Sequence, residues 1–226
     1  MFFFDNTMLI LIPAILLTLY AQYRVKSSYE KYAKIPAAIQ LSGKEVIDHL
    51  LRNNGLKTVS IEMIPGKLTD HYDSKRKILR LSREVFYGQT VASHAIAAHE
   101  FGHVIQDSTK YFPLVLRSYL VPISNIGSRM AVPLFLIGFI FSLPGLMEIG
   151  IIAFSLVVLF QIITLPVEFD ASKKALKMLR ACNMVDEKDI IPVRKVLNAA
   201  ALTYIAATSV AVMQLLRLIV LRNRRG

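Results

Sequence analysis

The chain has 226 residues, of which 54% are hydrophobic, and a mean hydropathy of +0.47, which excludes an ordinary soluble domain and is typical of an integral membrane protein. Its formal net charge of +11 does not indicate a nucleic-acid partner, because the basic residues flank apolar runs and no aromatic-basic pattern is present. Cys182 is the only cysteine, which excludes an internal disulfide and a C-x-x-C metal site.

The first apolar run covers residues 8–20, after a Phe2–Phe4 start, and Arg24 and Lys26 follow it at once. A secretory signal would carry its positive charges before the apolar core and a cleavage site after it. We therefore predict an uncleaved membrane anchor over residues 1–23. By the positive-inside rule, the segment that follows this anchor is cytoplasmic.

Residues 24–117 form the polar part of the chain. A capping box of Ser42 and Glu45 opens a helix that Gly55 ends. Alternating apolar residues predict strands over 58–64 and 77–82, with a polar loop over 70–75 between them. A further helix follows, from about residue 90 to residue 106.

That last helix contains His99-Glu100-Phe101-Gly102-His103, an H-E-x-x-H motif that a chain of this composition would contain by chance only about 0.004 times. Residues four apart lie on one helix face, so both imidazoles can hold one metal ion. Glu100 lies beside that face, where it can take a proton from the attacking water. A helix, a small sheet and a metal-binding helix in this order are common in metallopeptidase domains. There, an exposed strand edge can pair with the backbone of the substrate.

Residues 131–167 carry Glu148 as their sole charge, and Pro144–Gly145 interrupts them. We predict a transmembrane hairpin within residues 118–167. Residues 168–195 are polar, and Glu168 and Asp170 are expected to open an amphipathic helix there. An apolar helix follows over 196–226. If this helix spans the membrane, its arginine-rich end lies outside, against the charge rule. The alternatives are that it is tilted, re-entrant or packed against the catalytic domain.

A catalytic zinc site needs a third protein ligand besides two histidines, and an open position. The hairpin returns the chain to the side that it left, which brings Glu168 within reach of a metal on His99 and His103. The alternative is that the acidic residues at 168 and 170 only stabilise a helix N-terminus, which contributes about 0.3–1 kcal/mol.

The chain resembles the YugP-type neutral zinc metallopeptidases of bacteria over essentially its whole length. The matching stretches are residues 68–73, 97–106, 167–172 and 202–204. The layout is also similar to that of the heat-shock membrane protease HtpX and its CAAX-protease relatives, where an H-E-x-x-H helix and a later E-x-x-x-D segment bracket two spans. The resemblance implies that His99, His103 and Glu168 hold one Zn²⁺ per chain, with Glu100 as the base. Ser172 stands where those relatives have Asp, so the residue that orients a ligand histidine is open, and Asp170 could itself be the ligand.

His71, Tyr72 and Tyr204 could stabilise an oxyanion. A loop histidine is more often solvated, and tyrosines near a membrane are usually interface anchors. His94 is five residues before His99 and points elsewhere on the helix, so we expect a structural role for it.

We therefore expect a mainly α integral membrane protein with a small β-sheet, a zincin-like metallopeptidase domain and about four apolar membrane segments. The expected function is a zinc metalloendopeptidase in the plasma membrane of a bacterium. It would hydrolyse misfolded or membrane proteins at the cytoplasmic membrane surface, with the lipid bilayer and protein substrates as partners. The alternative is a non-catalytic metal-binding scaffold, a pseudoprotease, although such a site would not need Glu100. A site-2 type intramembrane protease is disfavoured, because polar residues interrupt the metal-binding helix.

Overall fold

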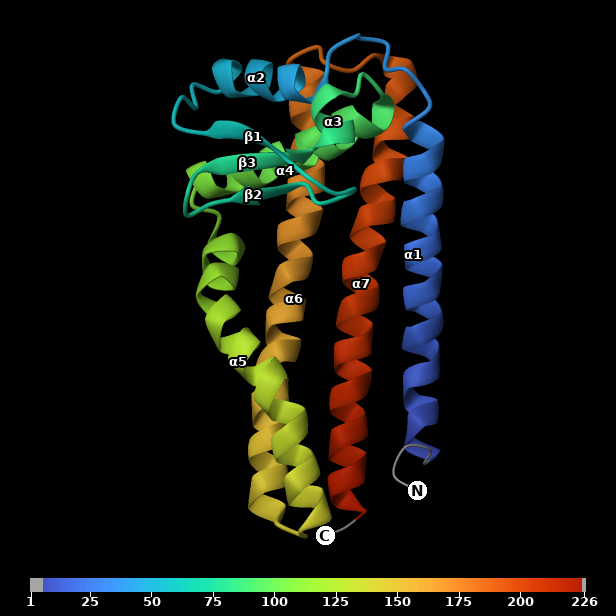
Figure 1. Cartoon of the computed structure of the whole chain (residues 1–226), viewed down its shortest axis with the longest axis vertical. Coiled ribbons are helices and arrows are strands. Elements are labelled where there is room, and N and C mark those ends of the chain that lie inside the picture. The colour runs from blue at the N-terminus through green and yellow to red at the C-terminus, as the bar shows by residue number, and fades with distance from the viewer. Residues whose placement is uncertain (1–5, 225–226) are drawn as a thin grey trace. The chain divides into compact units, whose positions relative to one another are not determined.

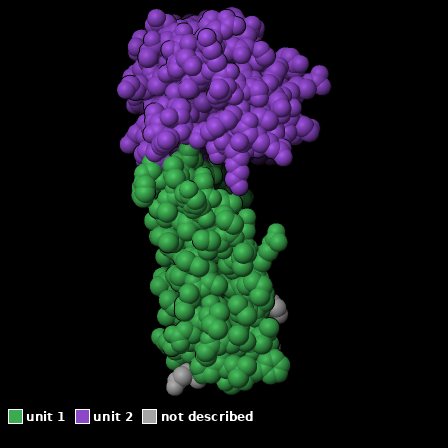
Figure 2. Space-filling view, turned by 90° about the vertical axis from the view of Figure 1, so that its left-hand side faces the viewer, with its two compact units in different colours: residues 1–22, 112–166, 202–226 green, residues 23–111, 167–201 purple. Residues whose placement is uncertain are grey.

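The computed structural model describes residues 6–224, so the Phe2–Phe4 start of the predicted anchor lies outside the described residues. As predicted, the chain is mainly helical with one small sheet (Figure 1). It divides into two compact units, coloured in Figure 2. Unit 1 comprises Met1–Gln22, Phe112–Pro166 and Leu202–Gly226, and unit 2 comprises Tyr23–Tyr111 and Val167–Ala201.

Within the described residues 6–224, four helical segments are long and apolar enough to cross a membrane. They are η1 with α1 (Asn6–Leu11 and Ile12–Tyr32), α5 (Phe112–Ile140), α6 (Pro144–Ala181) and α7 (Glu187–Asn223). The predicted break at Pro144 is confirmed, because α5 ends at Ile140 and α6 begins at Pro144. The first arm begins at Phe112, well before the charge-free stretch of sequence, so both arms are long enough to span a bilayer.

Unit 2 contains the sheet and the shorter helices. They are α2 (Gly43–Asn53), β1 (Ser60–Ile64), β2 (His71–Asp73), β3 (Ile78–Ser82), α3 (Arg83–Tyr87) and α4 (Val91–Ser108). The predicted capping box at the start of α2 is confirmed, since Ser42 Oγ accepts from the Glu45 N–H and the Glu45 carboxylate accepts from the Ser42 N–H at 2.7 Å. Gly55 ends the helix with a positive φ of 67°, a conformation that glycine adopts without strain.

The sheet has the order β1-β3-β2, with β1 parallel and β2 antiparallel to β3. The prediction of a polar loop over 70–75 is wrong, because His71–Asp73 pairs with β3 there. A three-residue polar strand has no apolar alternation to reveal it, and its backbone pairing with Leu79 and its neighbours decides its conformation. As an edge strand, β2 also contacts α4.

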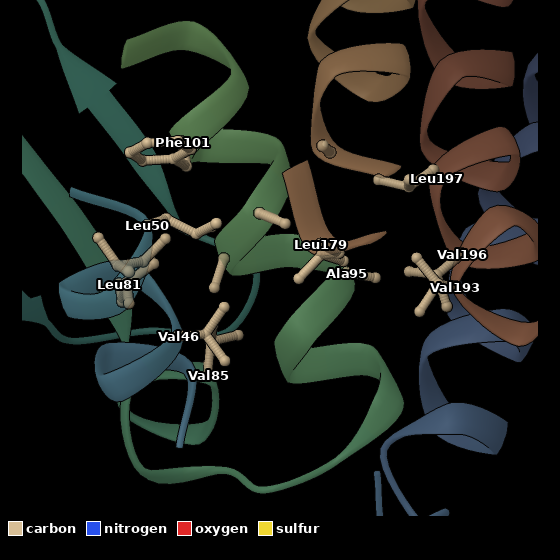
Figure 3. Close-up of a cluster of buried hydrophobic side chains, with 14 of the residues drawn as sticks. Val46, Leu50, Leu81, Val85, Ala95, Phe101, Leu179, Val193, Val196 and Leu197 are labelled. Carbon is tan, nitrogen blue, oxygen red and sulfur yellow. The ribbon is translucent and has the colours of Figure 1, made fainter. Parts of the chain in front are cut away.

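The core of unit 2 surrounds α4. Figure 3 shows Ala95 and Phe101 of this helix among side chains from α2, β3, α6 and α7. The core cluster also includes Leu50, Leu81 and Leu179, which are fully buried. This packing holds α4 rigidly within unit 2.

Glu168 and Asp170 do not open a helix, contrary to the prediction. They lie inside α6, which runs without a break from Pro144 to Ala181. Pro166 stands inside this helix, and a proline there removes a single backbone hydrogen bond, which a long packed helix can tolerate. The acidic side chains are therefore displayed on a rigid helical segment.

Candidate metal centre

Two helices of unit 2 bring three potential metal ligands together. His99 and His103 lie one turn apart on α4, with ring centroids 5.0 Å from each other. Glu168 comes from residues 167–181 of α6, and its Oε2 lies 3.2 Å from His99 Nε2 and 3.6 Å from His103 Nε2. One ligand atom from each residue lies within 4.8 Å of the other two. Such a triangle can close around one cation.

The second nitrogen of each imidazole is held by a neutral side chain. Ser172 Oγ lies 3.2 Å from His99 Nδ1, and Gln106 Oε1 lies 2.9 Å from His103 Nδ1. Gln106 Nε2 donates to the Val167 carbonyl, so Oε1 is the atom that faces the histidine and accepts from Nδ1. This leaves Nε2 of His103, which faces Glu168, as the nitrogen that would bind a metal.

Asp170 is not one of the three clustered ligands. Its Oδ2 accepts from Gln106 Nε2 at 2.8 Å and from Lys174 Nζ. The Lys174 ammonium also lies over the ring of Tyr111, 4.9 Å from its centroid. Asp170 therefore supports the amide of Gln106, which in turn holds His103.

Gly102 allows the two ligand-bearing helices to approach closely. A Cβ atom at this position would lie 2.5 Å from the carbonyl oxygen of Ala171 and 3.0 Å from its Cα. Any larger residue would push α4 away from the turn of α6 that carries Glu168 and Ser172.

Glu100 is buried beside the ligand cluster, with 8% of its surface exposed. Burial raises the pKa of its carboxyl to about 7, opposed by the charge of His99 and assisted by the carboxylates of Glu168 and Asp70. The backbone of Tyr72 on β2 also lowers the pKa of this carboxyl. A carboxyl group with a pKa near neutrality is suited to accept and return a proton.

The edge strand β2 is fixed against α4 by side chains. Tyr72 Oη donates to Asp107 Oδ2 at 2.6 Å. Burial, and next this hydrogen bond, raise the pKa of Tyr72. His71 Nδ1 lies 2.8 Å from the Thr69 carbonyl, and its Nε2 lies 3.3 Å from Arg80 Nη1. His71, the first residue of β2, thus contacts Thr69 and Arg80 of β3 and is not part of the ligand triangle.

Two further predictions concern a histidine and a tyrosine that are not among the three clustered ligands. His94 is 2% exposed and its Nε2 lies 2.7 Å from the Leu41 carbonyl, which fits the predicted structural role. Tyr204 lies on α7 in unit 1, and its role as an oxyanion donor stays a prediction.

The residues present fit zinc. Two imidazole nitrogens and one carboxylate oxygen form the ligand set of catalytic zinc sites that keep one position open. The second nitrogen of each histidine is already bound by a protein side chain, as is usual for metal-ligating imidazoles. A buried carboxyl, that of Glu100, adjoins the site.

Comparison with known proteins agrees with this geometry. The chain matches the family described as "Putative neutral zinc metallopeptidase" over residues 7–223. The protein belongs to that family. It is also 42% identical over 210 residues to "Putative membrane protease YugP" of Bacillus subtilis (strain 168), a match that covers 93% of each chain. No solved structure matches the chain significantly. The predicted family is therefore confirmed, and the four apolar helices with this relative support a membrane protein.

Sequence reasoning had not found the supporting residues of this metallopeptidase-family site. Gln106 lies three residues after His103, so its position on the same helix face could have been read from the spacing. The sequence comparison showed Ser172 only as a residue that replaces the Asp of relatives. In the structure, its hydroxyl contacts His99. The contact of Tyr72 with Asp107 depends on the strand β2, which the sequence pattern did not reveal.

Proposed function

We propose that this protein is a zinc-dependent metalloendopeptidase that acts at the cytoplasmic surface of the bacterial plasma membrane. The observation that supports this most strongly is the convergence of His99 Nε2, His103 Nε2 and Glu168 Oε2 beside the buried Glu100. These three residues would hold one zinc ion per chain. When bound, zinc polarises the scissile carbonyl and lowers the pKa of a water molecule toward about 7.

The chain's own residues supply proton transfer and substrate alignment. Glu100 accepts a proton on its carboxylate as water attacks, and then passes this proton to the leaving amine. The outer edge of β2 pairs with an extended substrate backbone, since β2 is an edge strand and contacts α4. Such backbone pairing imposes little side-chain selectivity, which suits misfolded or membrane proteins as substrates.

The predicted oxyanion roles belong to this proposal as well. Tyr204 would donate its phenol from α7, and His71 would have to release Arg80 or Thr69 before donating to an oxyanion. Exchanging His71 for Gln retains a donor and tests whether imidazole chemistry matters. Equal rates for both forms would reduce His71 to a structural residue of the sheet.

Cleavage of casein and of an unfolded membrane protein by the purified full-length chain tests the function. Glu100→Gln should lower the rate at least 100-fold, the usual loss on removing a general base, and should still bind zinc. Glu84→Gln, at an exposed acidic residue of α3, is the matched control and should cleave normally. Equal cleavage by both variants, insensitive to chelator, would refute the proposal. Zinc binding without cleavage in the wild type would favour the scaffold alternative.

The orientation rests on the distribution of basic residues. Unit 2 carries the cations that follow the first span and those that follow Val167, and such clusters face the cytoplasm. The orientation can be tested with a chain in which Cys182→Ser removes the native cysteine and Lys57→Cys places a single cysteine in the exposed loop after α2. A membrane-impermeant maleimide should label this cysteine only after the cells are opened. Labelling in intact cells would show that residue 57 faces the outside and would contradict the proposed orientation.

A further inference from the structure

A groove separate from the ligand triangle lies in unit 2 between α6 and α7. It has a volume of about 760 Å³ and is formed by residues 169–181 and 194–201, a size usual for small-molecule sites. Its apolar lining includes Phe169, Leu176 and Leu197. Phe169 is 39% exposed, whereas Leu197 is 4% exposed. The groove therefore offers an apolar surface that opens toward its surroundings.

Four cations line the same groove: Lys173, Lys177, Arg180 and Arg194. All four are exposed. Within residues 6–224, neither an acidic side chain nor a backbone carbonyl pairs with any of their charged groups, whereas the neighbouring Lys174 pairs with Asp170. Four unneutralised cations in one groove favour an anionic ligand. The apolar lining between them favours a ligand that also carries hydrocarbon.

The position of these cations along α6 suits a membrane lipid. The charge-free stretch of this helix ends at Val167, and Lys173 and Lys177 follow about 9 and 15 Å further at 1.5 Å per residue. Side chains on a helix lean toward its N-terminus, which on α6 is the direction of the apolar stretch. Lysine side chains can therefore extend back toward the headgroup layer.

We propose that this groove binds an acidic phospholipid. Its phosphate contacts the cations of α6 and α7, and the start of an acyl chain lies on Phe169, Leu176 and Leu197. Ser172 also lines the groove while its hydroxyl contacts His99, so a bound lipid would lie beside the helix turn that supports the ligand triangle.

The test uses full-length protein in detergent, titrated with dioleoyl phosphatidylglycerol and followed by native mass spectrometry. One phosphatidylglycerol should bind saturably, and dioleoyl phosphatidylcholine should not replace it. Lys173→Gln/Lys177→Gln should weaken binding about 30-fold, from about 1 kcal/mol for each cation near an anionic lipid. Arg180→Gln/Arg194→Gln should act similarly, because it removes one cation from each helix.

The matched control is Arg52→Gln/Lys57→Gln, which removes two exposed cations of unit 2 far from residue 169 in sequence and outside the groove lining. It should leave phosphatidylglycerol affinity unchanged. Loss of affinity in this control, or wild-type affinity in both groove variants, would overturn the proposal. Glycerol 3-phosphate binding as tightly as the lipid would indicate a soluble-anion site instead. Displacement of the lipid by an equal concentration of a glutamate-rich peptide would assign the groove to an acidic protein.

Discussion

Gln106→Met is the sharpest test of how the ligand triangle is held. The Gln106 side chain is fully buried and makes three hydrogen bonds, to His103, the Val167 carbonyl and Asp170. Methionine has a similar length and shape but can replace none of these bonds. The substitution therefore removes the acceptor of the His103 N–H with little change in packing volume.

Two estimates of the free-energy cost of this substitution agree. Leaving a buried donor without a partner costs about 1–3 kcal/mol. Removing a residue that orients a metal-binding histidine usually weakens metal affinity about 10–100-fold, which corresponds to about 1.4–2.8 kcal/mol. We therefore expect zinc to bind Gln106→Met about 10–100-fold more weakly than wild type.

Competition with a chromophoric chelator measures zinc affinity on the full-length protein in detergent, and the thermal midpoint of the metal-free protein reports the fold. Gln89→Met, the same exchange at an exposed glutamine, is the control and should match wild type in both measurements. Wild-type zinc affinity in Gln106→Met would refute the orienting role. A lowered metal-free midpoint with unchanged affinity would identify Gln106 as a packing residue.

Three further predictions concern residues around the same cluster. Gly102→Ala should destabilise the protein by about 1–3 kcal/mol, because its Cβ would clash with the Ala171 carbonyl. Gly145→Ala, where a Cβ has no neighbour within 4 Å, should be tolerated in the same thermal melts. Ser172→Asp should tighten zinc binding about tenfold, because a carboxylate makes His99 a stronger ligand, and chelator competition showing weaker binding would contradict this. Because the folded pKa of Glu100 is raised to about 7, the metal-free protein should lose about 3 kcal/mol of stability as the pH rises from about 4.5 through 7. Glu100→Gln should abolish that loss in melts across this pH range, and an unchanged slope would exclude Glu100 as its source.

Local sequence patterns were enough for much of the fold. The capping box at Ser42 and Glu45 satisfies helix donors within four residues, so the start of α2 is a local matter. The apolar stretch around Pro144 is close to the length of two membrane spans, so a hairpin follows from length and the turn residues. The H-E-x-x-H spacing alone placed two imidazoles on one helix face.

Other features depended on contacts between distant segments. The strand β2 forms because β3 and α4 are present, and its polar residues carry no periodic signal. The continuation of α6 through Glu168 was missed because the change from apolar to polar residues suggested a new helix start. A helix can continue across such a change, since its backbone bonds do not depend on which solvent surrounds it.

By itself, the sequence determined the family, the presence of about four apolar segments and the residue types available for a metal, because these depend on composition and on spacing within single helices. Only the tertiary structure decided which carboxylate meets the histidines. Glu168 and Asp170 are two residues apart on α6 and therefore point in different directions, and the close packing at Gly102 turns the first toward His99 and the second toward Gln106. That choice is a property of how two helices cross, which no local pattern contains.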